Sequence, residues 1–232
     1  MRRAVLCLLV VAGCATDKHI RQSEEDGDRL RVDLAETYIN KRAYTAAIPF
    51  LRRALQEHPN DAHIHVLYGT VLREQGLYPQ ADHELTEATR LSPTSGEAWA
   101  SKGVLYDLMR RHSDAEAAHR KAIELNPLMA TYWNNLGFSL YISGRNDEAI
   151  TALEKALALD PGLVMAYNNL GFAYGKRGDM ESAERCFRTA GGQTRALVNM
   201  AVVYDGRGEK ESAARMRAEA KALDPKVDLE EP

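Results

Sequence analysis

Two stretches of the sequence decide the fold. Residues 133–161 read WNNLGFSLYISGRNDEAITALEKALALDP, and residues 167–190 read YNNLGFAYGKRGDMESAERCFRTA. Both contain N-N-L-G-F followed by regularly placed alanines, and the second stretch lies 34 residues after the first. Within each stretch the apolar residues recur at helical spacing, which places them on one face of a helix. The two stretches therefore predict an internal repeat made of helices.

The period of 34 residues runs through most of the chain. Prolines fall at 59, 93, 127 and 161, and alanines fall at 47, 81, 115, 149 and 183. A third column holds small residues, namely Ala35, Gly69, Gly103, Gly137, Gly171 and Ala201. The last members of the three columns, Pro225, Ala213 and Ala201, each come four residues early. Three columns thus share one period and one deletion of four residues in the fifth copy.

This pattern resembles a known repeat family. A unit of 34 residues with W-x2-L-G-x2-Y, then A-x3-F, then P is typical of the tetratricopeptide repeat. The fourth copy matches with Trp133, Leu136, Gly137, Ala149, Leu153, Ala156 and Pro161. The fifth matches with Tyr167, Leu170, Gly171, Tyr174, Ala183, Phe187 and Ala190. The chain departs from the family at Lys102, His119 and Arg217, where large apolar residues are usual.

The resemblance implies an all-α solenoid of six helix-turn-helix units with about twelve helices. The six units cover 28–61, 62–95, 96–129, 130–163, 164–193 and 194–227, and residues 228–232 form a tail. Gly76, Gly144, Gly178 and Gly208 share one place between the two helices of a unit, where a left-handed helix end is expected. The prolines follow the second helix, which they cannot continue. A single unit cannot bury its apolar face, so the stack forms one continuous core.

The N-terminus has the layout of a targeting segment. Two arginines precede an apolar run from Ala4 to Ala12, which is too short to span a bilayer. Val11-Ala12-Gly13-Cys14 resembles a bacterial lipobox, which implies a signal peptide over 1–13 and lipid on Cys14. In lipoproteins of two-membrane bacteria, Asp directly after the lipidated cysteine favours retention in the inner membrane. Here that position is Ala15, so the resemblance implies the periplasmic face of the outer membrane. The alternatives are an ordinary signal peptide with an incidental cysteine, or a start codon assigned too late. Residues 14–27 then form the lipidated cysteine and a polar, flexible tether.

No catalytic chemistry is apparent in the sequence. Of 232 residues, 45% are hydrophobic and 27% charged, and 30 basic against 33 acidic side chains disfavour a nucleic-acid binder. Phosphate-binding loops, nucleophile elbows and metal-binding helix motifs are absent. His63 and His65 are two residues apart and so face different sides of a helix. We therefore expect no catalytic residue, no metal, no cofactor and no enzymatic activity.

A candidate binding surface lies on the first helices of the units. In the repeat family these helices line a concave groove, and the family resemblance places eight residues of this chain on it: Asn134, Asn135, Phe138, Tyr141, Asn168, Asn169, Phe172 and Asn199. Asparagine is a mediocre helix former, so five in register need a reason. Its amide can pair with the backbone of an extended peptide. The alternative is that the amides bond locally, to a neighbouring helix or to water.

The combination of a lipobox with six repeats resembles the pilotin-like lipoproteins of type IV pilus biogenesis. That resemblance implies a lipid-anchored scaffold that binds a protein partner, an outer-membrane secretin, and helps it to assemble. Two other roles stay open at this point. One is a periplasmic adaptor for cell-wall hydrolases or proteases, and the other is a part in outer-membrane protein assembly.

Overall fold

The computed structural model describes residue 27 and residues 29–229, so Cys14 and the predicted signal peptide lie outside the described part. The described residues are helical with short connections and contain no strand, which confirms the all-α prediction. They divide into two compact units, with the boundary between Pro93 and Thr94. None of the described helices is both long enough and apolar enough to cross a membrane.

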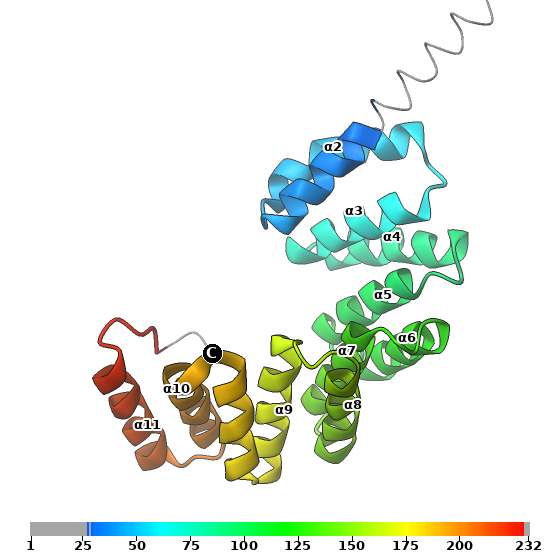
Figure 1. The fold of residues 1–232 in the computed structure, drawn as a ribbon. Coiled ribbons are helices and arrows are strands. Elements are labelled where there is room, and N and C mark those ends of the chain that lie inside the picture. Colours follow the sequence, from blue (N-terminus) through cyan, green and yellow to red (C-terminus); the bar gives the residue numbers. More distant parts are fainter. Residues whose placement is uncertain (1–26, 28, 230–232) are drawn as a thin grey trace, which may run out of the picture. The chain divides into compact units, whose positions relative to one another are not determined.

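Unit 1 contains the first two predicted repeats. A helix over 29–40 pairs with α2 (Tyr44–Glu57), and α3 (Ala62–Glu74) pairs with α4 (Tyr78–Leu91) (Figure 1). Ala35, Ala47 and Leu51 are fully buried in the core between the first three helices. The Asp61 carboxylate accepts hydrogen bonds from the backbone N–H groups of His63 and Ile64 and so caps the start of α3.

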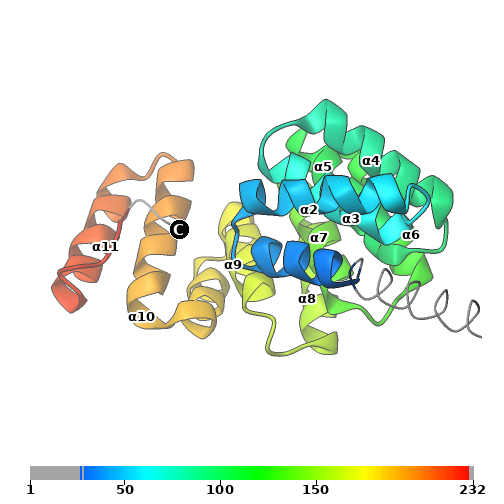
Figure 2. The ribbon, with the colours of Figure 1, turned by 90° about the horizontal axis from the view of Figure 1, so that it is seen from above.

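Unit 2 contains the other four predicted repeats. Its helices are α5 (Gly96–Leu108), α6 (His112–Leu125), α7 (Ala130–Ile142), α8 (Asn146–Leu159), α9 (Val164–Arg177), α10 (Met180–Gly206) and α11 (Lys210–Leu223). Helices α10 and α11 lie side by side in both views (Figures 1 and 2). The long α10 breaks at Gly191 and Gly192, whose backbone angles are not helical. It therefore comprises the second helix of the shortened repeat and the first helix of the next.

The connections within and between repeats follow the columns of the sequence. Gly76, Gly144, Gly178 and Gly208 all have positive φ angles, as a left-handed helix end requires. Arg42 and Arg110 take the same place in the first and third repeats, with φ of 56° and 58°. Left-handed backbone costs a residue with a side chain about 1–2 kcal/mol relative to glycine. These two arginines thus have a left-handed backbone conformation at a position where the other four repeats have glycine.

The small residues of the repeats are there for steric reasons. The alanines at 47, 81, 115, 149, 183 and 213 are all 0% exposed. A Cβ added to Gly137 would lie 2.5 Å from Leu153, and one added to Gly171 would lie 2.5 Å from the Phe187 ring. The glycine column of the first helix therefore faces the large apolar column of the second helix.

The structure explains the departures from the repeat pattern. His119 replaces the large apolar residue of its repeat, and its Nε2 lies 3.0 Å from the Asp107 carboxylate. Arg217 takes the equivalent place in the last repeat and pairs with Asp205, which is equivalent to Asp107. Lys102 places its Nζ 5.8 Å from the Trp99 ring centre and 5.7 Å from that of Tyr106. Each polar departure thus has a partner of complementary charge or an aromatic face.

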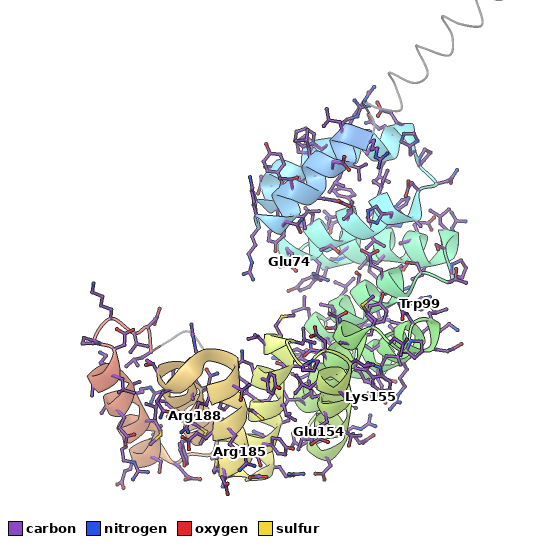
Figure 3. The ribbon with its side chains drawn as sticks, in the orientation of Figure 1. Glu74, Trp99, Glu154, Lys155, Arg185 and Arg188 are labelled. Carbon is purple, nitrogen blue, oxygen red and sulfur yellow. The ribbon has the colours of Figure 1, made fainter. Side chains whose placement is uncertain are left out.

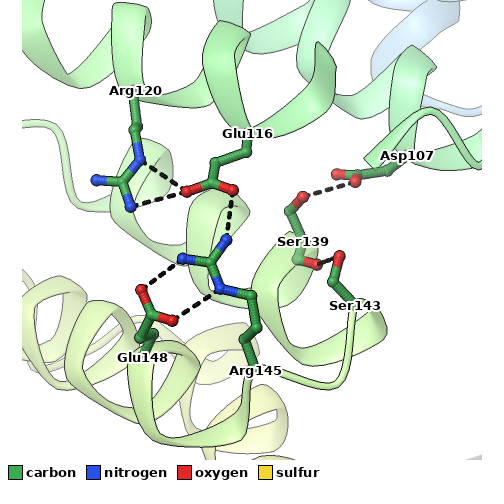
Figure 4. Close-up of polar contacts among 7 residues, drawn as sticks. All are labelled: Asp107, Glu116, Arg120, Ser139, Ser143, Arg145 and Glu148. Carbon is green, nitrogen blue, oxygen red and sulfur yellow. Dashed lines mark hydrogen bonds and ion pairs between the residues drawn. The ribbon is translucent and has the colours of Figure 1, made fainter. Parts of the chain in front are cut away.

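A network of ion pairs connects α6 with the start of α8. The Arg145 guanidinium contacts both Glu116 and Glu148, and Glu116 also accepts from Arg120 (Figure 4). Burial alone would raise the pKa of the Glu116 carboxyl, but the hydrogen bonds from Arg120 and Arg145 outweigh it and lower the pKa. The network joins successive repeats on a charged surface.

The second helices of the repeats carry many other charges. Figure 3 shows Glu154 and Lys155 on α8, and Arg185 and Arg188 on α10. Arg185 pairs with Glu181, and Arg188 pairs with Glu184, one helical turn away in each case. Nearby, burial raises the pKa of the Cys186 thiol to about 11. The thiol is therefore protonated at neutral pH and packs with the core as a small apolar group.

Candidate functional site

The first helices of the third, fourth and fifth repeats enclose a cavity, called the groove below. Its volume is about 830 Å³. Helix α5 and the turn after it contribute Val104, Asp107, Leu108 and Arg110, and α6 contributes His112. Helix α7 contributes Asn134, Asn135, Phe138 and Ile142, and α9 contributes Met165, Asn168, Asn169 and Phe172. Val104, Phe138 and Phe172 hold the same position in three successive repeats, so the repeat itself positions the site.

The groove is apolar over much of its wall and open to solvent. Met165 is 58% exposed, Leu108 49%, Phe138 41% and Ile142 37%. The Phe172 ring contacts the Tyr141 ring with centroids 6.5 Å apart, and it packs edge-on against the buried Phe187 at 4.8 Å. Large apolar side chains converging on one open cavity mark an interaction site.

The asparagines of the first helices bond to each other from repeat to repeat. Asn169 Nδ2 donates to Asn134 Oδ1 at 2.9 Å, and Asn199 Nδ2 donates to Asn168 Oδ1 at 3.1 Å. Asn134 Nδ2 donates to Asn135 Oδ1 at 3.4 Å. In each link between repeats, the sixth residue of one unit donates to the fifth residue of the unit before it. The local bonding considered as an alternative is therefore present in this structure.

Six of the eight predicted groove residues line the groove, and two do not. Asn199 is only 1% exposed, because its amide is used between α10 and α9. Tyr141 packs between the rings of Phe138 and Phe172, and burial raises the pKa of its hydroxyl. In the structure these two residues therefore do not form part of the cavity wall. The groove runs over repeats three to five.

Sequence reasoning missed the charged end of the groove. Asp107 is 8% exposed, and its carboxylate accepts a hydrogen bond from Ser139 Oγ at 2.7 Å (Figure 4). The same carboxylate also contacts His119. Arg110 is exposed at the wall of the groove, and within residues 27 and 29–229 its side chain has no ion-pair partner. The signal was available, because arginine stands there where four other repeats have glycine.

Four other basic residues of the first helices, Arg29, Arg73, Lys176 and Arg195, do not line the groove. Arg73 pairs with its neighbour Glu74. In the described part of the chain, no group of three or more His, Cys, Asp or Glu side chains is placed to hold a metal ion. The groove wall offers apolar surface, the amides of four asparagines, the Arg110 guanidinium, the His112 imidazole and the buried Asp107 carboxylate.

Models of the tetratricopeptide repeat match residues 41–105 and 96–127, and a TPR repeat model matches residues 139–178. The chain is built of tetratricopeptide repeats. Among curated proteins, a protein O-mannosyl-transferase of Caenorhabditis elegans is 32% identical over 68 residues. That match covers 29% of this chain and a tenth of the relative's length, so it concerns a shared stretch of repeats and not the whole protein.

Solved tetratricopeptide-repeat structures show the same fold. PilW, described as a widely conserved type IV pilus biogenesis factor, aligns with a TM-score of 0.74 at 19% identity, over 87% of this chain and 96% of PilW. PilF of Pseudomonas aeruginosa aligns with a TM-score of 0.69 at 20% identity, over 88% and 94% of the two chains. YrrB, described as a TPR protein with an unusual peptide-binding site, aligns with a TM-score of 0.56 at 20% identity, over 77% and 94%.

Proposed function

We propose that this tetratricopeptide-repeat chain is a non-catalytic scaffold that binds an extended segment of a partner protein in the groove. One observation carries the proposal. Leu108, Phe138, Ile142 and Met165 are large apolar residues from two neighbouring helices and the start of a third, and all stay exposed on one cavity wall. A stable fold gains by burying such side chains, so a partner that covers them gains the same free energy.

The polar part of the groove supports an extended occupant. The Asn135 side-chain carbonyl accepts one long hydrogen bond, from Asn134, and its Nδ2 donates to no side chain in the described part of the chain. An amide with unused donors and acceptors can pair with a peptide backbone, which presents both. The peptide-binding site named for YrrB, on the same fold, agrees with this use of the helices.

The groove is tested with a variant that removes exposed apolar groups. We expect Phe138→Ala/Met165→Gln to lose partner capture by about tenfold or more, because anchors at the centre of an interface dominate affinity. Stability should fall by about 1 kcal/mol or less, since both residues are exposed. The measurement is capture of membrane proteins on the immobilised chain, with thermal melting in parallel.

Leu128→Gln is the matched control, because Leu128 is 75% exposed and does not line the groove. It should retain capture in full. If the double variant captures as wild type does, the partner binds elsewhere and the groove proposal is wrong. Asn169→Ala is a poor choice here, since it would strip Asn134 of its hydrogen-bond donor.

We further infer a lipid-anchored, pilotin-like role at the periplasmic face of the outer membrane. The lipobox ending at Cys14 supports the anchor, and the nearly full-length likeness to PilW and PilF supports a role in type IV pilus biogenesis. The proteins captured above, identified by mass spectrometry, test the partner. A secretin supports this role, whereas cell-wall hydrolases, proteases or barrel-assembly proteins point to the alternatives.

The anchor is tested by one substitution. We expect Cys14→Ala to abolish metabolic labelling with radioactive palmitate and to release the chain from membranes into the soluble fraction, because the thiol that carries the lipid is gone. Cys186→Ala is the control and should label as wild type, since its thiol is half-buried and protonated. Undiminished labelling of the Cys14 variant would mean that the lipobox reading is wrong.

A further inference from the structure

Arg110 has an unusual position in the groove. It lies in the turn between α5 and α6 and has a left-handed backbone conformation. The equivalent residue is glycine in four other repeats. Arg42 has the same backbone in unit 1 but does not line the groove. The backbone strain alone therefore says nothing about function. The environment of the side chain is what distinguishes Arg110.

The charge of Arg110 is uncompensated within the groove wall. It is the one lysine or arginine among the residues that line the groove, and it is exposed. Asp107 is the one carboxylate of that wall, but it is buried and already contacts His119 and Ser139. In the described part of the chain no acidic side chain lies within ion-pair distance of the Arg110 guanidinium. The groove thus presents a free cation at the end formed by α5 and α6.

Exposed apolar residues line the same groove as this cation. Leu108 is two residues before Arg110, and the exposed side chains of Phe138 and Ile142 come from the neighbouring α7. A guanidinium presents a fork of N–H donors that fits a carboxylate with two hydrogen bonds. Next to apolar surface such a pair is better shielded from water than on an open surface.

We propose that the groove selects a segment in which an Asp or Glu side chain stands next to a large apolar residue. The carboxylate binds the Arg110 guanidinium, and the apolar neighbour covers Leu108, Phe138 and Ile142. A chain-terminal carboxylate suits the turn less well, because the backbone N–H groups of Arg110 and Arg111 already donate to Asp107 and Tyr106 carbonyls. This proposal rests on the proposed function and specifies the chemistry of its partner.

The turn offers a variant that removes the charge without harming the fold. Arg110→Gly deletes the guanidinium and relieves the left-handed backbone, so we expect its melting temperature to rise by a few degrees. Arg42→Gly should rise similarly and serves as the matched control. Because both variants are at least as stable as wild type, lost binding cannot be ascribed to unfolding.

The probe is a library of random peptides displayed on phage through their C-termini, so that only side-chain carboxylates are presented. We expect wild type and Arg42→Gly to enrich peptides with Asp or Glu beside an aromatic or large aliphatic residue. Synthetic peptides of the enriched sequences should bind Arg110→Gly about tenfold or more weakly, as loss of a charge-assisted pair predicts. Replacing the acidic residue by its amide should weaken binding to wild type equally and leave Arg110→Gly unaffected.

Two results would overturn the proposal, and they differ in meaning. If enriched peptides require Phe138 and Met165 but bind Arg110→Gly as tightly as wild type, the groove binds peptides and the acidic preference is wrong. If no enriched peptide depends on Phe138 and Met165, the groove itself is not the binding site. The second result removes both this inference and the proposed function.

Discussion

Replacement of His119 by leucine is expected to lower the free energy of unfolding by about 3–5 kcal/mol, although leucine is the usual residue at this place in the repeat. His119 is 0% exposed, and its Nε2 lies 3.0 Å from Asp107 Oδ2. Without the imidazole, the buried carboxylate keeps only the Ser139 hydroxyl as a donor. A buried charge that has lost a partner lowers the stability of the fold, whereas two well-packed apolar side chains at the same places would not. Urea unfolding followed by circular dichroism measures the loss.

The first repeat supplies the control for this prediction. Ile39 and Leu51 occupy there the places of Asp107 and His119, so the Asp107→Ile/His119→Leu variant reproduces a pair that the chain already uses. We expect this double variant to recover at least half of the stability lost by His119→Leu. The remainder reflects the Ser139 hydroxyl, which loses its acceptor. Independent, additive effects of the two substitutions would contradict a coupled pair.

Replacement of Phe187 by alanine is the second large effect, with an expected loss of about 3–5 kcal/mol from the cavity that it opens. Phe187 is 0% exposed and fills the space that Gly171 leaves on the facing helix. Its ring also supports Phe172, which lines the groove, with ring centroids 4.8 Å apart. We therefore expect both a lower unfolding midpoint in urea and weaker partner capture at temperatures where the variant is still folded.

Phe138→Ala separates these two consequences. Its ring is 41% exposed and lines the groove without filling the core, so its removal should cost about 1 kcal/mol or less. Capture should fall in both variants, but stability should fall only in Phe187→Ala. Equal melting of the two variants would mean that the fifth repeat is not packed as described.

The departures at His119 and Arg217 show how the repeat accommodates polar residues at this place, where His119 is buried and Arg217 is partly exposed. In both repeats an aspartate stands twelve residues earlier, at Asp107 and Asp205, and contacts the second-helix residue. In the other repeats that aspartate is replaced and the second-helix residue is apolar. The buried Asp107 carboxylate needs its His119 partner, since an unpaired buried charge is costly, whereas the Arg217–Asp205 pair is partly exposed to solvent.

The sequence by itself determined the all-α repeat architecture, which follows from a period of 34 residues because a repeated backbone places equivalent residues on equivalent faces. The glycine column was predictable for the same reason, since each of its glycines faces a large residue of its own unit. The groove residues were expected from the resemblance to the repeat family, and six of them stand on the cavity wall. Arg110 could have been found as well, as an arginine in a glycine column.

Only the tertiary structure decided how the polar side chains are used. The sequence showed five asparagines in register but not that Asn199 is buried against Asn168, or that Asn169 donates to Asn134. It marked His119 as an exception without revealing Asp107 as its partner. The physical reason is that register sets which face a residue occupies, whereas hydrogen bonds depend on side-chain rotamers and on distances of a few ångströms between helices. Those distances exist only once the repeats have packed against one another.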